Sequence, residues 1–193
     1  MHVAPAVTRL FAPPLEADRI HPDVVAAFQE ACDAELGPLF AYVRYRVDSA
    51  QTAEELTSAA FLRALERIGQ FDPARGDMRQ WIFAIARHLV SDHLRARRRW
   101  IVVPLEWLNA RDSSQPTPEQ AAADTERQVR LARAIAKLSR RQRDVIGMKF
   151  GAGLTNREIA AVTGLKEGYV AVLIQRALAR LKARLEAQGV THV

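Results

Sequence analysis

The chain has 193 residues, of which 49% are hydrophobic and 26% are charged, so it can form packed cores and general disorder is excluded. No apolar run approaches the roughly 20 residues of a membrane helix, and the first 19 residues lack the basic start and apolar core of a signal peptide. We therefore expect a cytoplasmic protein without membrane insertion. The single cysteine, Cys32, excludes an internal disulfide; it is interpreted as a small buried apolar residue, with a redox sensor as the alternative.

The net charge of +6 is unevenly distributed along the chain. Residues 127–193 hold fourteen Lys and Arg against four Asp and Glu, a net charge of +10, whereas residues 1–126 have a net charge of −4. A basic C-terminal third suits a polyanion such as nucleic acid, and an acidic remainder suits a second, different partner. The alternative interpretation is that the basic residues lie on solvated helix faces. Charge alone does not decide between this interpretation and binding to nucleic acid.

Helical periodicity begins after a Pro-rich segment. Residues 1–22 are expected to be a flexible N-terminal extension. A helix is expected over residues 23–47, interrupted or kinked near Gly37 and Pro38. A capping box with Thr52 as N-cap predicts the start of a second helix.

A third helix is expected after a loop at residues 71–76, with Asp77 as its cap and its end near residue 98. Aromatic and basic side chains interleave along it, which suits single-stranded DNA because bases stack on rings and cations hold phosphates. Two alternatives stay open: Trp81 is a core residue, and the basic helix end is a solvated terminus that the helix dipole favours. An acidic linker follows over residues 101–126, and its Pro-containing stretch suits neither helix nor strand.

The sharpest local pattern is a helix-turn-helix between residues 155 and 176. Thr155 opens a capping box, and Gly164 can adopt the positive φ of a turn. Ala160 and Val170 stand at the spacing at which a small and a β-branched residue let two helices pack closely. The second helix is then placed to enter a major groove. An ordinary helical hairpin is the alternative.

The helices on either side of this motif complete the second domain. A helix over residues 138–150, capped by Ser139, is expected to supply Phe150 to the core. In the recognition helix, residues 172–174 cannot all be buried, because three consecutive positions span about 200° of a helix. One of them is therefore expected to face DNA or a protein.

Four segments, in this order and spacing, resemble one known family. They are residues 53–65, 81–95, 138–146 and 154–182, and the similarity runs over roughly residues 28–186. The chain resembles an extracytoplasmic-function (ECF) sigma factor of the sigma-70 family.

The resemblance implies an all-α fold of two small helical domains joined by a flexible acidic linker, the second domain containing the helix-turn-helix. The first domain, residues 23–100, would be sigma region 2, which binds core RNA polymerase and the −10 promoter element. The second domain, residues 127–188, would be sigma region 4, which binds the −35 element. The implied function is to bind core polymerase, recognise both elements and promote DNA melting.

The family's roles carry over to three groups of residues in this chain. The expected polymerase-binding residues, which face the β′ coiled coil, are Glu54, Glu55, Thr57, Ser58 and Phe61. Those expected at the −10 element are Arg79, Trp81, Arg87, His88, Asp92, His93, Arg95 and Arg98. Those expected at the −35 element are Thr155, Arg157, Lys166, Glu167, Tyr169, Ala171, Gln175 and Arg176.

The implied partners are core RNA polymerase, through its β′ and β subunits, and promoter DNA. An anti-sigma protein is a further partner that the resemblance leaves open. The alternative function is a helix-turn-helix regulator that binds duplex DNA without polymerase. An enzyme is not expected, because the sequence contains no Gly-rich phosphate loop, nucleophile motif or metal-ligand spacing, and no cofactor or metal is expected either.

Overall fold

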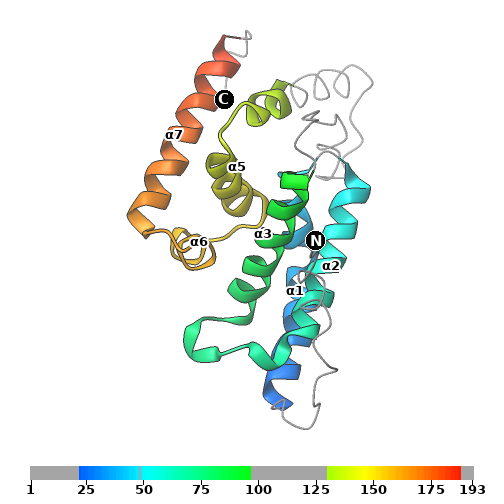
Figure 1. Ribbon diagram of the computed structural model, residues 1–193. Helices are drawn as coiled ribbons and strands as arrows, with labels where there is room; N and C mark the ends of the chain where they lie inside the picture. Colours follow the sequence, from blue (N-terminus) through cyan, green and yellow to red (C-terminus); the bar gives the residue numbers. More distant parts are fainter. Residues whose placement is uncertain (1–21, 48, 97–129, 188–193) are drawn as a thin grey trace, which may run out of the picture.

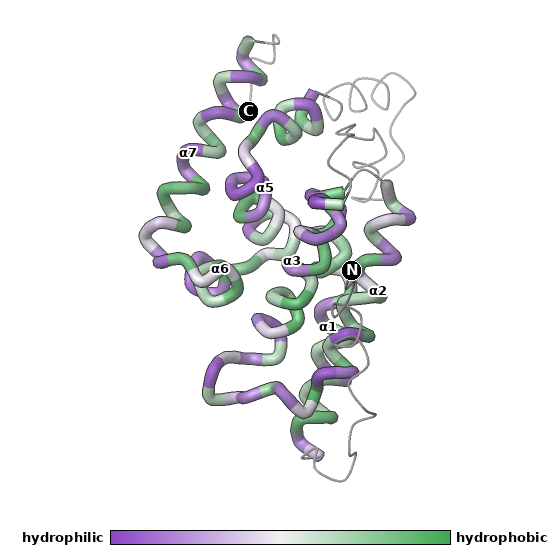
Figure 2. Tube along the Cα trace, viewed as in Figure 1, coloured by the Kyte–Doolittle hydropathy of each residue, from purple (hydrophilic) through white to green (hydrophobic). Residues whose placement is uncertain are grey.

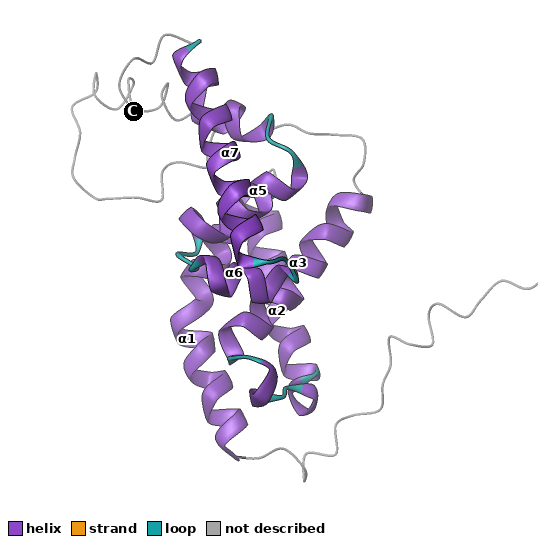
Figure 3. Ribbon diagram, turned by 90° about the vertical axis from the view of Figure 1, so that its left-hand side faces the viewer, coloured by secondary structure: helices purple, strands orange, loops and turns teal. Residues whose placement is uncertain are grey.

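The computed structural model describes residues 22–47, 49–96 and 130–187, and the regular structure there is entirely helical (Figure 3). Figure 1 shows two groups of helices that lie against each other. The first contains α1 (Pro22–Arg44), α2 (Ala50–Glu66) and α3 (Met78–Ala96); the second contains α5 (Arg140–Ile146), α6 (Asn156–Thr163) and α7 (Glu167–Glu186). The all-α prediction is confirmed. The predicted linker, and the predicted extension up to residue 21, lie outside the described residues.

Helix α1 is continuous through Gly37 and Pro38, so the predicted interruption is wrong. A proline inside a helix removes one hydrogen-bond donor and disfavours the preceding turn. The cost is offset here because buried residues on both sides of the proline, including Phe28 and Tyr42, hold the two halves of the helix in the same core.

The N-cap of α2 is Ser49, so the prediction of Thr52 as N-cap is wrong. The Thr52 backbone N–H donates to Ser49 Oγ at 3.0 Å, and the Ser49 hydroxyl donates to Thr52 Oγ1 at 2.7 Å. Both residues are good caps, and the helix starts at the first of them because Thr52 is buried inside the bundle. Asp77, in contrast, caps α3 as predicted, its Oδ1 accepting from the Gln80 backbone N–H at 2.7 Å.

The second domain starts with a helical segment at residues 130–136 and the predicted capping box of Ser139 at α5. Helix α5 then passes into a π-helical turn, η5 (Gly147–Gly151), in which the Ala152 N–H donates to the Gly147 carbonyl at 3.1 Å. A π turn contains an extra residue and so changes the phase of the side chains that follow. Phe150 is 44% exposed as a result, and the prediction that it lies in the core is wrong.

The helix-turn-helix is present as predicted. Thr155 forms the capping box of α6, Gly164 ends that helix at φ 71°, and Val170 is fully buried between α6 and α7. Leu173 and Ile174 are buried and Val172 is exposed, which confirms that one residue of this triplet faces outward.

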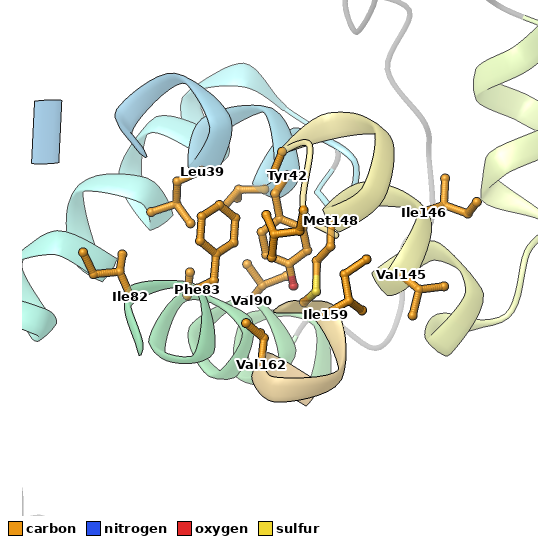
Figure 4. Packing of buried hydrophobic residues seen from close by; sticks show 14 of the residues in the cluster. Leu39, Tyr42, Ile82, Phe83, Val90, Val145, Ile146, Met148, Ile159 and Val162 are labelled. Atoms are coloured by element: carbon orange, nitrogen blue, oxygen red, sulfur yellow. The ribbon is translucent and has the colours of Figure 1, made fainter. Parts of the chain in front are cut away.

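One hydrophobic core runs through both domains. Figure 2 shows hydrophobic and hydrophilic residues alternating along the helices, and Figure 4 shows side chains of both domains meeting between α1, α3, η5 and α6. Tyr42 and Phe83 of the first domain and Met148 and Ile159 of the second are all fully buried there. The two domains of the structure are therefore docked.

Candidate polymerase and promoter interface

Helix α2 exposes part of the predicted polymerase-binding set. Glu54, Glu55 and Ser58 are exposed, Phe61 is half-buried, and Thr57 is only 2% exposed. The side chain of Thr57 therefore lies inside the first domain in this structure, away from any surface partner.

Two exposed leucines, which the sequence analysis did not identify, continue this surface. Leu62 is 62% exposed and Leu65 is 50% exposed. Glu55, Ser58, Leu62 and Leu65 follow the three- and four-residue spacing of one helix face, so they form a stripe with an acidic start and an apolar end. The spacing of apolar residues in the sequence could not show that these two leucines are exposed, because they are adjacent in sequence to core positions.

The C-terminal half of α3 carries several of the predicted −10 residues on its surface. Asp92 and Arg95 are exposed and form an ion pair at 2.6 Å. His88 is exposed, with Nδ1 2.7 Å from the Ala84 carbonyl oxygen. His93 is half-buried, and its buried Nε2 has no hydrogen-bond partner. Arg98 lies outside the described residues.

The N-terminal end of α3 borders a cleft of about 230 Å³. Trp81 is half-buried on its wall, its ring centroid 5.5 Å from that of Phe71 in the preceding loop. The polar side chains of Gln70, Arg75 and Gln80 also line it. Sequence reasoning identified Trp81 but missed the cleft, because its lining residues in the 70–77 loop, in α3 and at Ala161 of α6 come together only in the fold.

Two predicted −10 residues, Arg79 and Arg87, face the second domain. The Arg79 guanidinium donates to Glu35 Oε2 at 3.0 Å, to Glu158 Oε1 at 3.1 Å and to the Ala152 carbonyl at 2.9 Å. Arg87 Nε donates to Asp144 Oδ2 at 2.9 Å. In this structure both side chains join the domains.

Asp144 is the centre of a buried polar cluster that the sequence analysis missed. Its Oδ1 accepts hydrogen bonds from the Tyr42 hydroxyl at 2.7 Å and from Arg46 Nη1, while Oδ2 accepts from Arg87. Burial, and then the negative charge of Asp144, hold the pKa of Tyr42 well above its ordinary value. We call Tyr42, Arg46, Arg87 and Asp144 the Asp144 cluster.

The predicted −35 residues lie mostly on one accessible part of the second domain. Arg157, Lys166, Glu167, Gln175 and Arg176 are exposed, Tyr169 is 40% exposed, and Ala171 is half-buried. Thr155 has a structural role, since its hydroxyl and N–H both bond Glu158 in the capping box. Most of the predicted −35 residues are thus accessible to solvent, and their contact with DNA stays a prediction.

The described residues contain no group of three or more His, Cys, Asp or Glu placed to hold a metal ion. Over the same part of the chain, no helix combines the length and apolar character that crossing a membrane requires. Cys32 is half-buried, and burial followed by the charge of Asp33 raises the pKa of its thiol, which disfavours the reactive thiolate.

Two family models match the chain, sigma-70 region 2 over residues 33–100 and sigma-70 region 4 over residues 128–181. Together they cover more than half of its length. The chain belongs to the sigma-70 family. The predicted family and the predicted fold of two helical domains are thereby confirmed, and core RNA polymerase and promoter DNA are the partners that sigma factors of this family bind.

Among similar proteins, the ECF RNA polymerase sigma factor BldN of Streptomyces coelicolor is 37% identical over 82% of this chain and 60% of its own length. The ECF RNA polymerase sigma factor RpoE of Cereibacter sphaeroides is 35% identical over 70% of this chain and 74% of its own. The sigma factor described here thus spans less than two thirds of BldN and about three quarters of RpoE.

Two solved structures share its fold. CnrH, in complex with the cytosolic domain of CnrY, superposes with a TM-score of 0.61 and 24% identity over 84% of this chain and 90% of that one. RpoE of Bartonella quintana, in complex with the anti-sigma factor NepR, superposes with a TM-score of 0.63 and 20% identity over 82% of this chain and 96% of that one.

Proposed function

We propose that this sigma factor binds core RNA polymerase through α2, reads the −35 element with α6 and α7, reads the −10 element with α3 and its preceding loop, and promotes melting there. The observation that carries the proposal is the start of α7. It presents Tyr169, Val172, Gln175 and Arg176 to solvent while Leu173 and Ile174 anchor the helix from behind. This is the disposition of a helix that enters a major groove.

The contacts of α7 divide into two kinds. Gln175 can read a base edge through its amide, and Ala171 can contact a thymine methyl group. Arg157, Lys166 and Arg176 are exposed cations that suit phosphates, which position the helix without reading sequence. Affinity for the −35 duplex is therefore expected to depend steeply on salt.

The first domain is suited to a melted strand. Trp81 and Phe71 lie together at the cleft that leads to α3, and the far end of α3 carries exposed Arg95. An aromatic wall followed by a cation is the combination that binds unstacked bases and their phosphates.

The stripe on α2 is the proposed polymerase contact. Its carboxylate, Glu55, and its exposed leucines, Leu62 and Leu65, are on the surface of α2, and the exposed carboxylate of Glu54 lies beside them. A rim of charge beside a small apolar patch is typical of a protein–protein interface.

Catalysis is assigned to the polymerase, and the sigma factor acts as a transcription regulator without a reaction of its own. In two solved structures of the same fold, CnrH is bound to CnrY and RpoE is bound to the anti-sigma factor NepR. By analogy, we propose that a protein partner controls this chain as well.

The test is run-off transcription with purified core polymerase on a pool of promoter DNAs, together with co-elution of the chain and core on gel filtration. We expect co-elution, and transcripts from a subset of promoters only when the chain is added. Duplex binding without co-elution or transcripts would instead support the alternative, a regulator that acts without polymerase.

A further inference from the structure

We infer that α7 selects thymines in the −35 duplex by their methyl groups. Val172 is the residue that determines this specificity, and Gly168 is the position that lets the helix backbone approach the base pairs closely. This specificity rests on the proposed function, since it names the base pairs that the second domain selects.

Gly168 and Val172 lie on the outermost line of α7. Each is two residues from Val170, which is fully buried, and two residues correspond to about 200° of rotation about a helix axis. Both positions therefore face away from the core, and both are exposed. Ala179, seven residues after Val172, continues the line and is exposed as well. A helix that enters a major groove directs such a line at the base pairs.

The first two turns of α7 carry few side chains that can read a base by hydrogen bonds. Between residues 167 and 175, only the side chains of Glu167, Tyr169 and Gln175 can form them. The first cation within the helix is Arg176. Arginine and lysine are the usual readers of guanine, so these two turns lack the side chains that select it.

Val172 suits one group of the major groove in particular. Its side chain is 37% exposed, so it loses water when a base pair covers it. The C5-methyl of thymine is the apolar group in the major groove, whereas the other base edges there are hydrogen-bond donors and acceptors. A valine that covers a donor or acceptor leaves that group without a partner, which is costly. Val172 therefore favours thymine by contact and disfavours other bases by desolvation.

Gly168 is an independent observation that points to a close neighbour. It lies in the first turn of α7 without a positive φ, and an added Cβ would have nothing within 4 Å. Alanine is the better helix former, because glycine loses more backbone freedom on folding. Gly37 of α1 also borders open space, but it precedes Pro38, whose ring disfavours a Cβ on the residue before it. Within the described part of the chain nothing comparable explains Gly168, which suits the close approach of DNA.

The experiment measures promoter binding by the holoenzyme, formed from the full chain and core polymerase, on a promoter taken from the run-off pool. Each thymine of the −35 element, on either strand, is replaced in turn by deoxyuridine, which lacks only the C5-methyl. The burial of one methyl group corresponds to about fourfold in affinity. We expect at least one replacement to weaken binding by about this factor, and replacements outside both promoter elements to have no effect.

Val172→Ala tests which residue makes the contact. The change shortens an exposed side chain and alanine favours a helix, so the fold should persist, which circular dichroism checks. The variant should bind the thymine promoter more weakly, and deoxyuridine should no longer weaken binding further. Val25→Ala is the matched control, because Val25 is 40% exposed on α1 in the other domain, and it should keep the parent's response. An unchanged response to deoxyuridine in Val172→Ala would overturn the role of Val172.

Gly168→Ala tests the close approach. The added methyl group meets nothing within 4 Å in the protein, so thermal stability should equal or exceed that of the parent. Binding to a promoter with an intact −35 element should nevertheless weaken severalfold. A folded Gly168→Ala chain with the parent's affinity would overturn the role of Gly168.

A promoter whose −35 element is scrambled separates methyl reading from the proposed function. If the holoenzyme binds this promoter as well as the intact one, the proposed function and the methyl reading both fail. If the holoenzyme requires the −35 element but responds to none of the deoxyuridine replacements, the proposed function stands and the methyl reading is overturned.

Discussion

Arg79 and Glu158 join the two domains through a carboxylate that is already fixed in place. Glu158 Oε2 accepts from the Thr155 N–H at 2.7 Å and from its hydroxyl at 2.6 Å, and Oε1 accepts from Arg79 Nη1 at 3.1 Å. Because the capping box orients Glu158, the ion pair forms without ordering a free side chain. Burial alone would raise the pKa of Glu158, but the hydrogen bonds from Thr155 and the charge of Arg79 outweigh it and lower the pKa below its ordinary value.

Acid should weaken this junction. Since the pKa of Glu158 is lower in the folded than in the unfolded chain, the stability it contributes is complete above the ordinary value of 4.5 and is lost as pH falls through the folded value. Glu158→Gln should therefore be less stable than the parent by up to about 1 kcal/mol at pH 7, and nearly equal to it at pH 3. Urea unfolding at both pH values measures this difference, and a difference independent of pH would contradict the assignment.

Tyr42 should ionise only at a pH well above the ordinary pKa of a tyrosine. The chain contains three tyrosines, and the pKa of Tyr42 is raised by burial and by Asp144. A raised folded pKa means that the stability contributed by the neutral phenol is complete below the ordinary value of about 10 and is lost as pH rises through the folded value. Absorbance at about 295 nm should therefore show a late phase that coincides with loss of the Tyr42–Asp144 contact between the domains. Tyr42→Phe should abolish that phase, whereas Tyr169→Phe should not.

Charge reversal on α2 should weaken polymerase binding. Glu54→Lys with Glu55→Lys changes two exposed carboxylates without touching the core, so the fold should persist while the affinity for core falls roughly tenfold or more. A direct binding titration measures the affinity. Glu30→Lys with Asp33→Lys, an equal reversal at exposed positions of α1, is the control and should leave it unchanged. Equal effects of the two pairs would mean that overall charge, not this surface, matters.

Neighbouring residues of α7 should affect promoter binding in different ways. Arg176→Ala should weaken binding to all duplexes alike, by about 1 kcal/mol, and should reduce the salt dependence. Gln175→Ala should instead narrow the difference between strong and weak −35 sites, because it removes a base-edge contact. Fluorescence anisotropy on a set of duplexes at two salt concentrations separates the two patterns.

Arg95, in the last turn of α3, and Arg98, two residues beyond its described end in sequence, should matter at melting rather than at initial binding. Arg95→Ala and Arg98→Ala remove cations proposed to hold the melted strand, so permanganate reactivity of the −10 thymines should fall while the affinity for closed promoter duplex stays within about twofold. Normal melting by both variants would establish the alternative, a solvated helix end.

Local signals predicted the helices and the motif but not the contact between domains. Ser139, Thr155 and Gly164 act through backbone geometry within a few residues, and these predictions were confirmed. The start of α2 was assigned three residues late because Ser49 and Thr52 are equally good caps, and only burial decides between them.

The Asp144 cluster depends on pairings across about 100 residues, such as that of Tyr42 with Asp144, which no periodicity encodes. Arg79 and Arg87 were predicted as DNA contacts from their place in the α3 pattern. That pattern carries no information about a second domain lying against the same helix face. The glycine at position 147 was the local signal that could have indicated a close neighbour, because alanine suits a helix better.

The π turn at Gly147–Gly151 determines the direction in which the chain after it leaves α5. Removing one residue from this turn would restore ordinary α-helical phase and rotate the downstream chain by about 100° about the helix axis. The side chain of Phe150 would then change direction, and α6 and α7 would be displaced from their present directions. A one-residue deletion here would thus change the direction of α7, the helix proposed to read the −35 element, without altering any residue on it. A deletion in an exposed loop would instead change only the loop.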